Sequence, residues 1–232
     1  MNPPGAPGAP GETGASGGAG ASGGAGASGV PGVLTLIRHG ETEWSRSGRH
    51  TGRTDIALTA DGERQATALR SFLAGRRFVL VATSPRLRAT RTADLAGLLA
   101  TEPCVADRAV WPDLAEWDYG DLEGLTTPAI RRDRPGWSVF TGEVPGGETV
   151  EQIGRRADLV LATVRPWLER GDVALVGHSH MFRVLIARWL RLPPTAGACF
   201  VIVPAAVSEL GFERDTPVLR QLNLSAEGST RI

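Results

Sequence analysis

The sequence predicts an α/β fold in which a largely parallel sheet is flanked by helices on both faces. Three short apolar runs, at residues 33–37, 78–82 and 172–176, have the length and composition of buried strands. Between them lie longer stretches in which apolar residues recur at helical spacing. In such sheets ligands bind outside the carboxyl ends of the strands, so the residues that follow each run are candidates for function.

In the first half of the chain, the strand predicted at residues 33–37 stops at Arg38-His39-Gly40, which we interpret as a functional loop. Helical spacing over residues 59–74 predicts a helix that ends at Gly75. The strand at residues 78–82 is followed by Ser84-Pro85, a pair typical of an N-cap with proline at the first helical position. The helix that follows should extend to about Leu99.

In the second half, residues 148–169 have helical periodicity that halts at Gly171. The third strand, residues 172–176, leads into Gly177-His178-Ser179 and a helix to about Leu190. Three terminal strands are predicted at residues 199–203, 208–213 and 217–223.

The first 32 residues differ from the rest of the chain in composition. From Gly5 to Gly32 glycine occupies every third position, which is the collagen period. Collagen-like chains contain about 15–20% proline or more, whereas this stretch has only Pro7, Pro10 and Pro31. We therefore predict a disordered, flexible tail over residues 1–32, with a weak trimerising or interaction segment as the alternative. Residues 33–232 are expected to form one domain.

Charge and composition exclude several classes of function. The 25 cationic side chains, all arginine, balance 25 acidic ones, so neither nucleic acid nor a membrane surface is an expected partner. The lack of lysine excludes Schiff-base and P-loop lysines, while arginine suits forked binding of phosphate. Cys104 and Cys199 have no metal-ligand spacing, so we expect two buried thiols and no metal site. With neither a signal-type segment nor a bilayer-length apolar run, a cytoplasmic location is expected.

Two of the four histidines stand where a ligand is expected, because His39 and His178 each follow a predicted strand. Each could be a hydrogen-bonded structural histidine or a catalytic one. Arg86 and Arg88 lie near the start of a predicted helix, where a cation opposes the positive end of the helix dipole. Either a neighbouring carboxylate or a bound phosphate would compensate them.

A set of motifs in a fixed order extends this argument from about Leu34 to Arg191. They are Leu36-Ile37-Arg38-His39-Gly40-Glu41-Thr42, Thr51-Gly52, Asp55-Ile56-Ala57-Leu58-Thr59, Ser84-Pro85-Arg86-Leu87-Arg88-Ala89, Leu114-Ala115-Glu116-Trp117-Asp118-Tyr119-Gly120-Asp121-Leu122-Glu123-Gly124 and Gly177-His178-Ser179-His180. Together they resemble the histidine phosphatase superfamily, also called phosphoglycerate mutase-like. The resemblance implies the phosphoglycerate mutase-like version of the predicted fold.

The resemblance also implies a covalent mechanism that needs no metal and no cofactor. A neutral imidazole nitrogen of His39 would attack phosphorus and form a phosphohistidine, which water then hydrolyses. Arg38, Arg88 and His178 would surround the transferred phosphoryl group and stabilise its charge. Glu116 would give a proton to the leaving alkoxide and later activate water. A surface carboxylate is the alternative interpretation of Glu116.

The resemblance places further residues in the substrate pocket. The complete predicted set is Arg38, Ser45, Thr51, Gly52, Arg88, Glu116, Tyr119, Ser179 and His180. Ser45 stands where family members often have asparagine, and its hydroxyl could reach the phosphoryl group through water. Ser179 replaces the glycine that usually follows the second histidine. His180 points either into the pocket or along the helix, and His50 is expected in a loop near the entrance.

The motifs are more similar to sugar-phosphate phosphatases of the sedoheptulose bisphosphatase type than to glycolytic mutases, which have longer insertions. The cap is expected at about residues 126–148, where Arg131, Arg132 and Arg134 could bind a second phosphate or carboxylate or be solvated surface charge. The expected function is hydrolysis of small phosphate monoesters, with sugar phosphates favoured. A phosphoglycerate-type mutase and a non-catalytic phospho-ligand module are the alternatives. We expect a small phosphorylated metabolite as partner and a monomer or homodimer.

Overall fold

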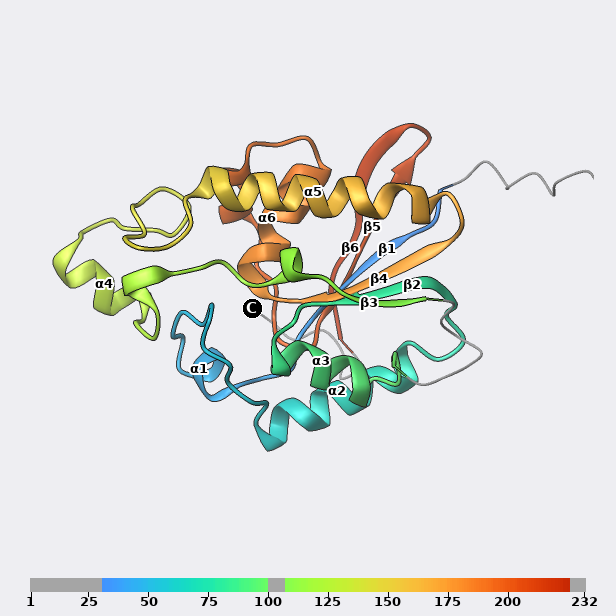
Figure 1. Ribbon diagram of the computed structural model, residues 1–232, viewed down its shortest axis with the longest axis horizontal. Coiled ribbons are helices and arrows are strands. Elements are labelled where there is room, and N and C mark those ends of the chain that lie inside the picture. Colours follow the sequence, from blue (N-terminus) through green and yellow to red (C-terminus); the bar gives the residue numbers. More distant parts are fainter. Residues whose placement is uncertain (1–30, 100–106, 226–232) are drawn as a thin grey trace, which may run out of the picture.

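The computed structural model describes residues 31–99 and 107–225, which contain a six-stranded sheet of order β3-β2-β4-β1-β5-β6 (Figure 1). The strands are β1 (Leu34–Arg38), β2 (Phe78–Thr83), β3 (Arg108–Val110), β4 (Asp172–Gly177), β5 (Val207–Glu213) and β6 (Thr216–Leu224). The first four strands in the order β3-β2-β4-β1 pair in parallel. β5 pairs antiparallel with β1, and β6 pairs antiparallel with β5. The predicted α/β class with a largely parallel sheet is confirmed.

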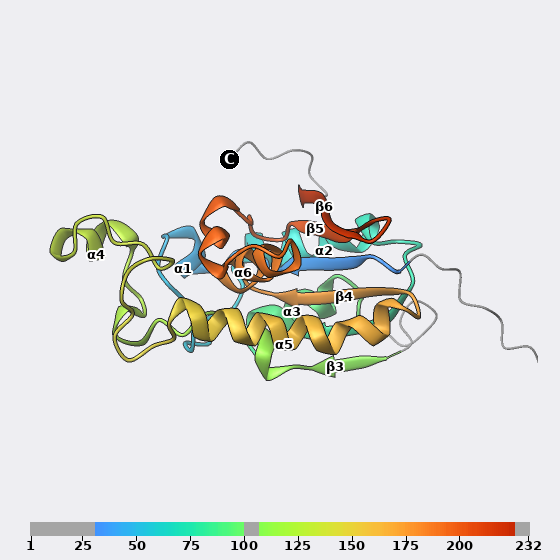
Figure 2. The same ribbon diagram turned by 90° about the horizontal axis from the view of Figure 1, so that it is seen from above.

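Helices cover both faces of the sheet (Figures 1 and 2). One face holds α2 (Ala60–Phe72) and α3 (Leu87–Leu95), and the other holds α5 (Val150–Leu168) and α6 (Ser179–Trp189). Alternate residues of a strand point to opposite faces, which is why β1 sends Leu34 and Leu36 into the core under α5 and α6. Ile37 enters the separate core under α2 and α3.

Side-chain caps fix where two of these helices begin. The Thr59 hydroxyl accepts the Gly62 N–H at the start of α2, and Thr149 forms a reciprocal capping box with Gln152 at the start of α5. The cap predicted at Ser84-Pro85 is wrong, because Arg86 is the N-cap of α3 and the helix ends at Leu95. The Ser84 hydroxyl accepts the Arg86 N–H at 3.3 Å and also lies 2.7 Å from His178 Nε2, so it contributes to the site.

The structure also corrects the predicted region around Cys199. Residues 199–203 do not form a strand, since the chain makes a 3-10 helix, η3 (Pro194–Cys199), and then continues without regular structure. Cys199 is exposed, so the expectation of a buried thiol is wrong there, while Cys104 lies outside the described residues. Short elements that were not predicted are β3, α1 (Glu43–Arg46), η1 (Pro112–Leu114), η2 (Gly120–Leu122) and α4 (Thr127–Asp133).

The parallel strands direct their carboxyl ends toward the side of the molecule where α1 and α4 project (Figure 2). α4 and the loops after it form the outermost part of this side (Figure 1). Residues 1–30 of the predicted tail lie outside the described part of the chain. Among the helices that the structure describes, none has the length and apolar character needed to cross a membrane.

Candidate active site

A cavity of about 400 Å³ opens beyond the carboxyl end of β1, within the size range of small-molecule sites. Its lining contains eight residues of the predicted site, namely Arg38, His39, Ser45, Thr51, Glu116, Tyr119, Ser179 and His180. It also contains Gly48, Arg49, His50, Thr127, Arg131, Ser138, Val139, Phe140, Arg183 and Ala198. Three predicted residues, Gly52, Arg88 and His178, lie behind this lining.

Backbone hydrogen bonds join His39 to the last residue of β4 and to the segment just before β5. Its N–H donates to the Gly177 carbonyl at 2.9 Å, and its own carbonyl accepts the Ala205 N–H at 3.1 Å. The next residue must be glycine, because a Cβ on Gly40 would collide with the Gly62 carbonyl of α2. The Arg-His-Gly sequence therefore fixes the imidazole at the floor of the cavity.

The imidazole of His39 is neutral and has a defined tautomer. Nδ1 lies 2.7 Å from the Gly40 carbonyl oxygen, which can only accept, so Nδ1 holds the proton and Nε2 has a free lone pair. Burial holds the pKa of His39 well below its usual 6.5, and the charges of Arg38 and Arg88 lower this pKa further. A neutral ring with a lone pair on Nε2 is the form that can attack phosphorus.

His178 lies beside His39, with the two ring centroids 5.2 Å apart. Its Nδ1 accepts from Arg88 Nε at 3.2 Å. Burial and the charge of Arg88 lower the pKa of His178 well below 6.5, so the ring is neutral and its proton is on Nε2. That proton is donated to the Ser84 hydroxyl at 2.7 Å, which leaves both ring nitrogens of His178 bound to protein groups.

Arg88 is fully buried, and its guanidinium holds the loop that follows α1. Nη1 donates to the Thr54 carbonyl at 3.0 Å, and Nη2 donates to the carbonyls of Thr51 at 3.0 Å and Gly52 at 3.3 Å. A carboxylate neighbour is present, since Asp55 Oδ1 lies 3.9 Å from Nη1. In this arrangement Arg88 and His178 support the floor of the cavity rather than line it.

Arg38 brings positive charge to the cavity itself. One Nη1 hydrogen bond joins it to the Ile202 carbonyl, while its buried Nε has no hydrogen-bond partner among the residues that the structure describes. Burial lowers the pKa of Arg38 to about 10, so the side chain remains charged near neutral pH. A buried donor without a partner costs about 1–3 kcal/mol, which an anion placed beside it would offset.

Glu116 is held at the amino end of α6, where the helix dipole favours a carboxylate. Its Oε1 accepts the N–H groups of Trp117 at 3.0 Å and Met181 at 2.8 Å, and its Oε2 accepts the His180 N–H at 3.1 Å. The side chain lines the cavity although the residue is only 8% exposed. The alternative of a surface carboxylate is therefore wrong.

Tyr119 and His180 form a polar pair in the wall of the cavity, with the hydroxyl 2.6 Å from Nδ1. Burial raises the pKa of Tyr119 well above 10, so the hydroxyl keeps its proton and donates it to Nδ1. The neutral His180 ring then has its own proton on Nε2, available to a ligand in the cavity. His50 packs on Tyr119 with ring centroids 4.7 Å apart, so it is a buried wall residue.

Two arginines line the outer cavity from opposite sides. Arg131, on α4, donates from Nε to the Trp137 carbonyl at 2.8 Å. Arg183, on α6, donates to the carbonyls of Gly197 and Ala198 at 3.0 and 3.2 Å, and its guanidinium lies 4.6 Å from the Phe140 ring centroid. Arg183 was not predicted, although its position three residues after His180 places both on one helix face.

The other predicted residues have local structural partners. The Ser45 hydroxyl donates to the Thr42 carbonyl at 3.0 Å and accepts the Thr42 N–H at 2.9 Å within the cap of α1. Gly52 donates its N–H to the Glu123 carboxylate at 2.8 Å. Of the predicted cap arginines, Arg131 alone is among the cavity-lining residues.

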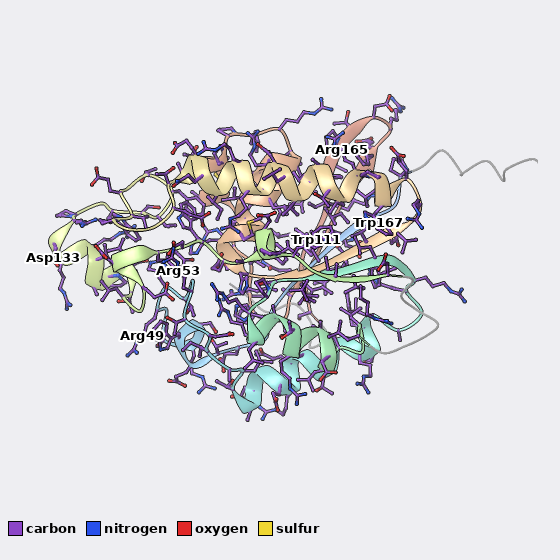
Figure 3. All side chains as sticks on the ribbon, viewed as in Figure 1. Arg49, Arg53, Trp111, Asp133, Arg165 and Trp167 are labelled. Carbon is purple, nitrogen blue, oxygen red and sulfur yellow. The ribbon has the colours of Figure 1, made fainter. Side chains whose placement is uncertain are left out.

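The loop after α1 and the segment that contains α4 both contribute residues to the cavity lining. In Figure 3, Arg49 and Arg53 lie where these two parts face one another, and Asp133 marks the outer end of α4. Within the described residues, no group of three or more His, Cys, Asp or Glu side chains is placed to hold a metal ion.

Comparisons with known proteins agree with this geometry. The family model described as "Histidine phosphatase superfamily (branch 1)" matches residues 34–225. An acid phosphatase of Mycobacterium tuberculosis is 42% identical over 194 residues, which cover 83% of this chain and 92% of that protein. A sedoheptulose 1,7-bisphosphatase of Saccharomyces cerevisiae is 35% identical over 182 residues, covering 68% of this chain and 67% of that protein.

A solved structure of an open reading frame from Mycobacterium tuberculosis has the same fold, with a TM-score of 0.79 and 41% identity. The match covers 84% of this chain and 98% of the other.

Proposed function

Because the chain belongs to the histidine phosphatase superfamily (branch 1), we propose that it hydrolyses small phosphate monoesters, sugar phosphates among them, through a phosphohistidine on His39. The observation that supports this most strongly is the pairing of a neutral His39 with the adjacent, half-buried Arg38, whose buried Nε has no partner among the described residues. Phosphatase names among the relatives favour hydrolysis over mutase chemistry. The intact set of polar groups in the cavity argues against a non-catalytic module.

The first step transfers the phosphoryl group to the enzyme. The phosphate oxygens bind beside Arg38, and His39 Nε2 attacks phosphorus in line with the leaving oxygen. As the bond between phosphorus and that oxygen breaks, the proton of the Glu116 carboxylic acid passes to the leaving oxygen, which makes the product an alcohol and leaves Glu116 as a carboxylate.

The second step returns the enzyme to its starting state. Water attacks the phosphohistidine, and the Glu116 carboxylate accepts its proton as the bond between phosphorus and Nε2 breaks. Inorganic phosphate leaves and the lone pair returns to Nε2. Arginine charge supplies the electrostatic stabilisation in both displacements.

The outer cavity supports a substrate with polar groups beyond the phosphate. Among the lining residues, four arginines face a single carboxylate, that of Glu116, so the cavity has an excess of positive charge. Arg131, Arg183 and the Nε2 proton of His180 are placed to bind hydroxyl, carboxylate or second phosphate groups. Binding of a second phosphate or carboxylate is one of the two roles expected for Arg131, and solvated surface charge is the other.

A phosphate-release screen over sugar phosphates, run beside a mutase assay primed with bisphosphoglycerate, tests the proposal. We expect phosphate release with sugar phosphates and little transfer between substrate positions. Efficient mutase turnover without phosphate release would contradict it. Arg131→Gln should raise KM for bisphosphorylated sugars, whereas Arg132→Gln, the next residue of the same helix and not a lining residue, serves as the matched control.

A further inference from the structure

Outside the cavity, Arg156 of α5 and Glu148 form a two-pronged ion pair. Arg156 Nε lies 2.9 Å from Glu148 Oε1, and Nη2 lies 2.6 Å from Oε2. Both side chains are mostly buried, with side-chain exposures of 15% and 21%. A pair of this geometry is more rigid than an exposed ion pair, because two parallel hydrogen bonds fix the plane of the guanidinium.

The rest of the Arg156 guanidinium binds the chain that leads to Glu116. Nη1 donates to the carbonyls of Asp113 at 2.8 Å and Ala115 at 2.5 Å. Nη2 donates to the carbonyl of Glu116 itself at 3.2 Å. Three backbone carbonyls within residues 113–116 are thus held by one planar group, and the position of that group is set by Glu148.

Glu148 holds the chain on the other side of Glu116. Its Oε2 accepts the Asp118 N–H at 3.0 Å, and its backbone carbonyl accepts Trp117 Nε1 at 2.9 Å. Its own N–H donates to the Asp118 carbonyl at 2.9 Å. The backbone of residues 147–148 lies so close to Asp118 that a Cβ on Gly147 would collide with the Asp118 carbonyl.

The carboxylate of Glu116 is oriented by N–H groups of α6, but its backbone is fixed by this pair. From the contacts on both sides of Glu116, we infer that Arg156 and Glu148 are positioning residues for Glu116 as proton donor, an inference that rests on the proposed function. A proton can be transferred only when donor and leaving oxygen come within hydrogen-bond distance, so a small shift of the segment lowers the rate. Neither residue is among those that line the cavity, so we expect neither to contact the substrate.

The pair also connects Glu116 to the cap. Glu148 is the last residue of the segment 126–148, which brings Arg131 and Phe140 to the cavity wall. A substrate that holds this segment in place would therefore also hold Glu116 in place. The effect should be greatest for substrates whose leaving group needs a proton.

The test uses Arg156→Lys, which keeps the charge but loses the fork, and Glu148→Gln, which keeps the shape but loses the charge. Arg188→Gln is the matched control, because Arg188 and Asp158 form a similar two-pronged pair between α5 and α6 at 2.8 and 3.1 Å, away from Glu116. For each full-length variant, single-turnover phosphoenzyme formation is measured with glycerol 2-phosphate and with p-nitrophenyl phosphate. Because p-nitrophenolate leaves without protonation, the rate with p-nitrophenyl phosphate measures phosphoenzyme formation that does not depend on proton transfer.

The quantity compared is the rate of phosphoenzyme formation with glycerol 2-phosphate divided by the rate with p-nitrophenyl phosphate. We expect Arg156→Lys and Glu148→Gln to lower this ratio by about tenfold or more, and Arg188→Gln to leave it within about twofold. Loss of folded protein alone would lower both rates together and leave the ratio unchanged. If the ratio falls in Glu116→Gln but not in Glu148→Gln, the inference is overturned while the proposed function stands. An unchanged ratio in Glu116→Gln overturns the inference together with the assignment of Glu116 as proton donor, while the phosphohistidine on His39 is tested separately by trapping the phosphoenzyme. If Arg156→Lys does not fold, Glu148→Gln provides the same comparison.

Discussion

Replacing Glu116 with glutamine removes the carboxyl group that can give up and take back a proton, while leaving the shape of the cavity almost unchanged. The amide oxygen can keep the two N–H groups of Trp117 and Met181 that now bind Oε1. The amide nitrogen would then face the His180 N–H, 3.1 Å from the present Oε2, and this donor would lose its acceptor. Loss of one such contact should lower the free energy of unfolding by about 1–3 kcal/mol. The variant should therefore remain folded.

The chemical effect should be larger than the effect on stability and should depend on the leaving group. A positioned general acid contributes about 10²- to 10⁴-fold, so phosphoenzyme formation from a sugar phosphate should fall by at least about 100-fold. With p-nitrophenyl phosphate, the same step should fall by less than about tenfold, since no proton is needed. Rapid-quench single-turnover measurements separate this step from hydrolysis of the phosphoenzyme.

An equal loss with both substrates would refute the assignment of Glu116 as the general acid. Asp118 and Glu123 would be poor replacements, because Asp118 pairs with Arg53 at 2.6 Å and Glu123 accepts the Gly52 N–H at 2.8 Å. Neither lines the cavity, whereas His180 does. The role would then pass to the Nε2 proton of His180.

Further predictions concern charge, metal and pH. Arg38→Gln should lower kcat/KM for phosphate monoesters by about 10²- to 10³-fold in steady-state assays, since a donor to developing charge is lost, and a loss under tenfold would contradict this role. EDTA should leave activity unchanged and vanadate should inhibit, whereas activity lost on chelation and restored by Mg²⁺ would refute a metal-independent reaction. Burial lowers the pKa of His50 from 6.5 to about 4. As pH falls, the His50 ring therefore takes up a proton in the unfolded chain before it does so in the folded protein, which favours unfolding. The contribution of neutral His50 to the free energy of unfolding, about 3 kcal/mol, should be present above pH 6.5 and lost between about pH 6.5 and 4. In urea unfolding, a His50→Gln variant should therefore lose less stability over that pH range than the wild-type protein. The same pH dependence in both proteins would contradict the lowered pKa of His50.

The sequence was sufficient for β1, β2, β4, β5 and β6 and for the large helices because their signals are local, whereas the three-residue strand β3 was not predicted. Apolar runs for β1, β2 and β4 and helical spacing for α2, α5 and α6 follow directly from which faces are buried. The start of α3 was misplaced because Ser84 has the composition of a cap, while its hydroxyl is bound by a histidine 94 residues away. No local pattern could indicate that contact.

The candidate site was predictable to the extent that it follows the motifs. His39, Arg38 and Glu116 meet in one cavity as expected, although they come from β1 and from the segment after η1. No motif in the sequence indicated Arg183, because its place in the cavity depends on how α6 packs beside residues 197–198. The supporting position of Arg88 likewise depends on the fold of the loop over residues 51–54.

The central claim, that His39 Nε2 accepts the phosphoryl group, is tested most directly by trapping the phosphoenzyme. Enzyme mixed with ³²P-labelled substrate and quenched within the first turnover should contain about one acid-labile, alkali-stable phosphoryl group per chain, as a phosphohistidine requires. Mass spectrometry under alkaline conditions should place it on His39, and His39→Ala should neither form it nor turn over while retaining its far-UV circular dichroism. Substantial phosphatase activity in folded His39→Ala, or label on another residue, would contradict the account.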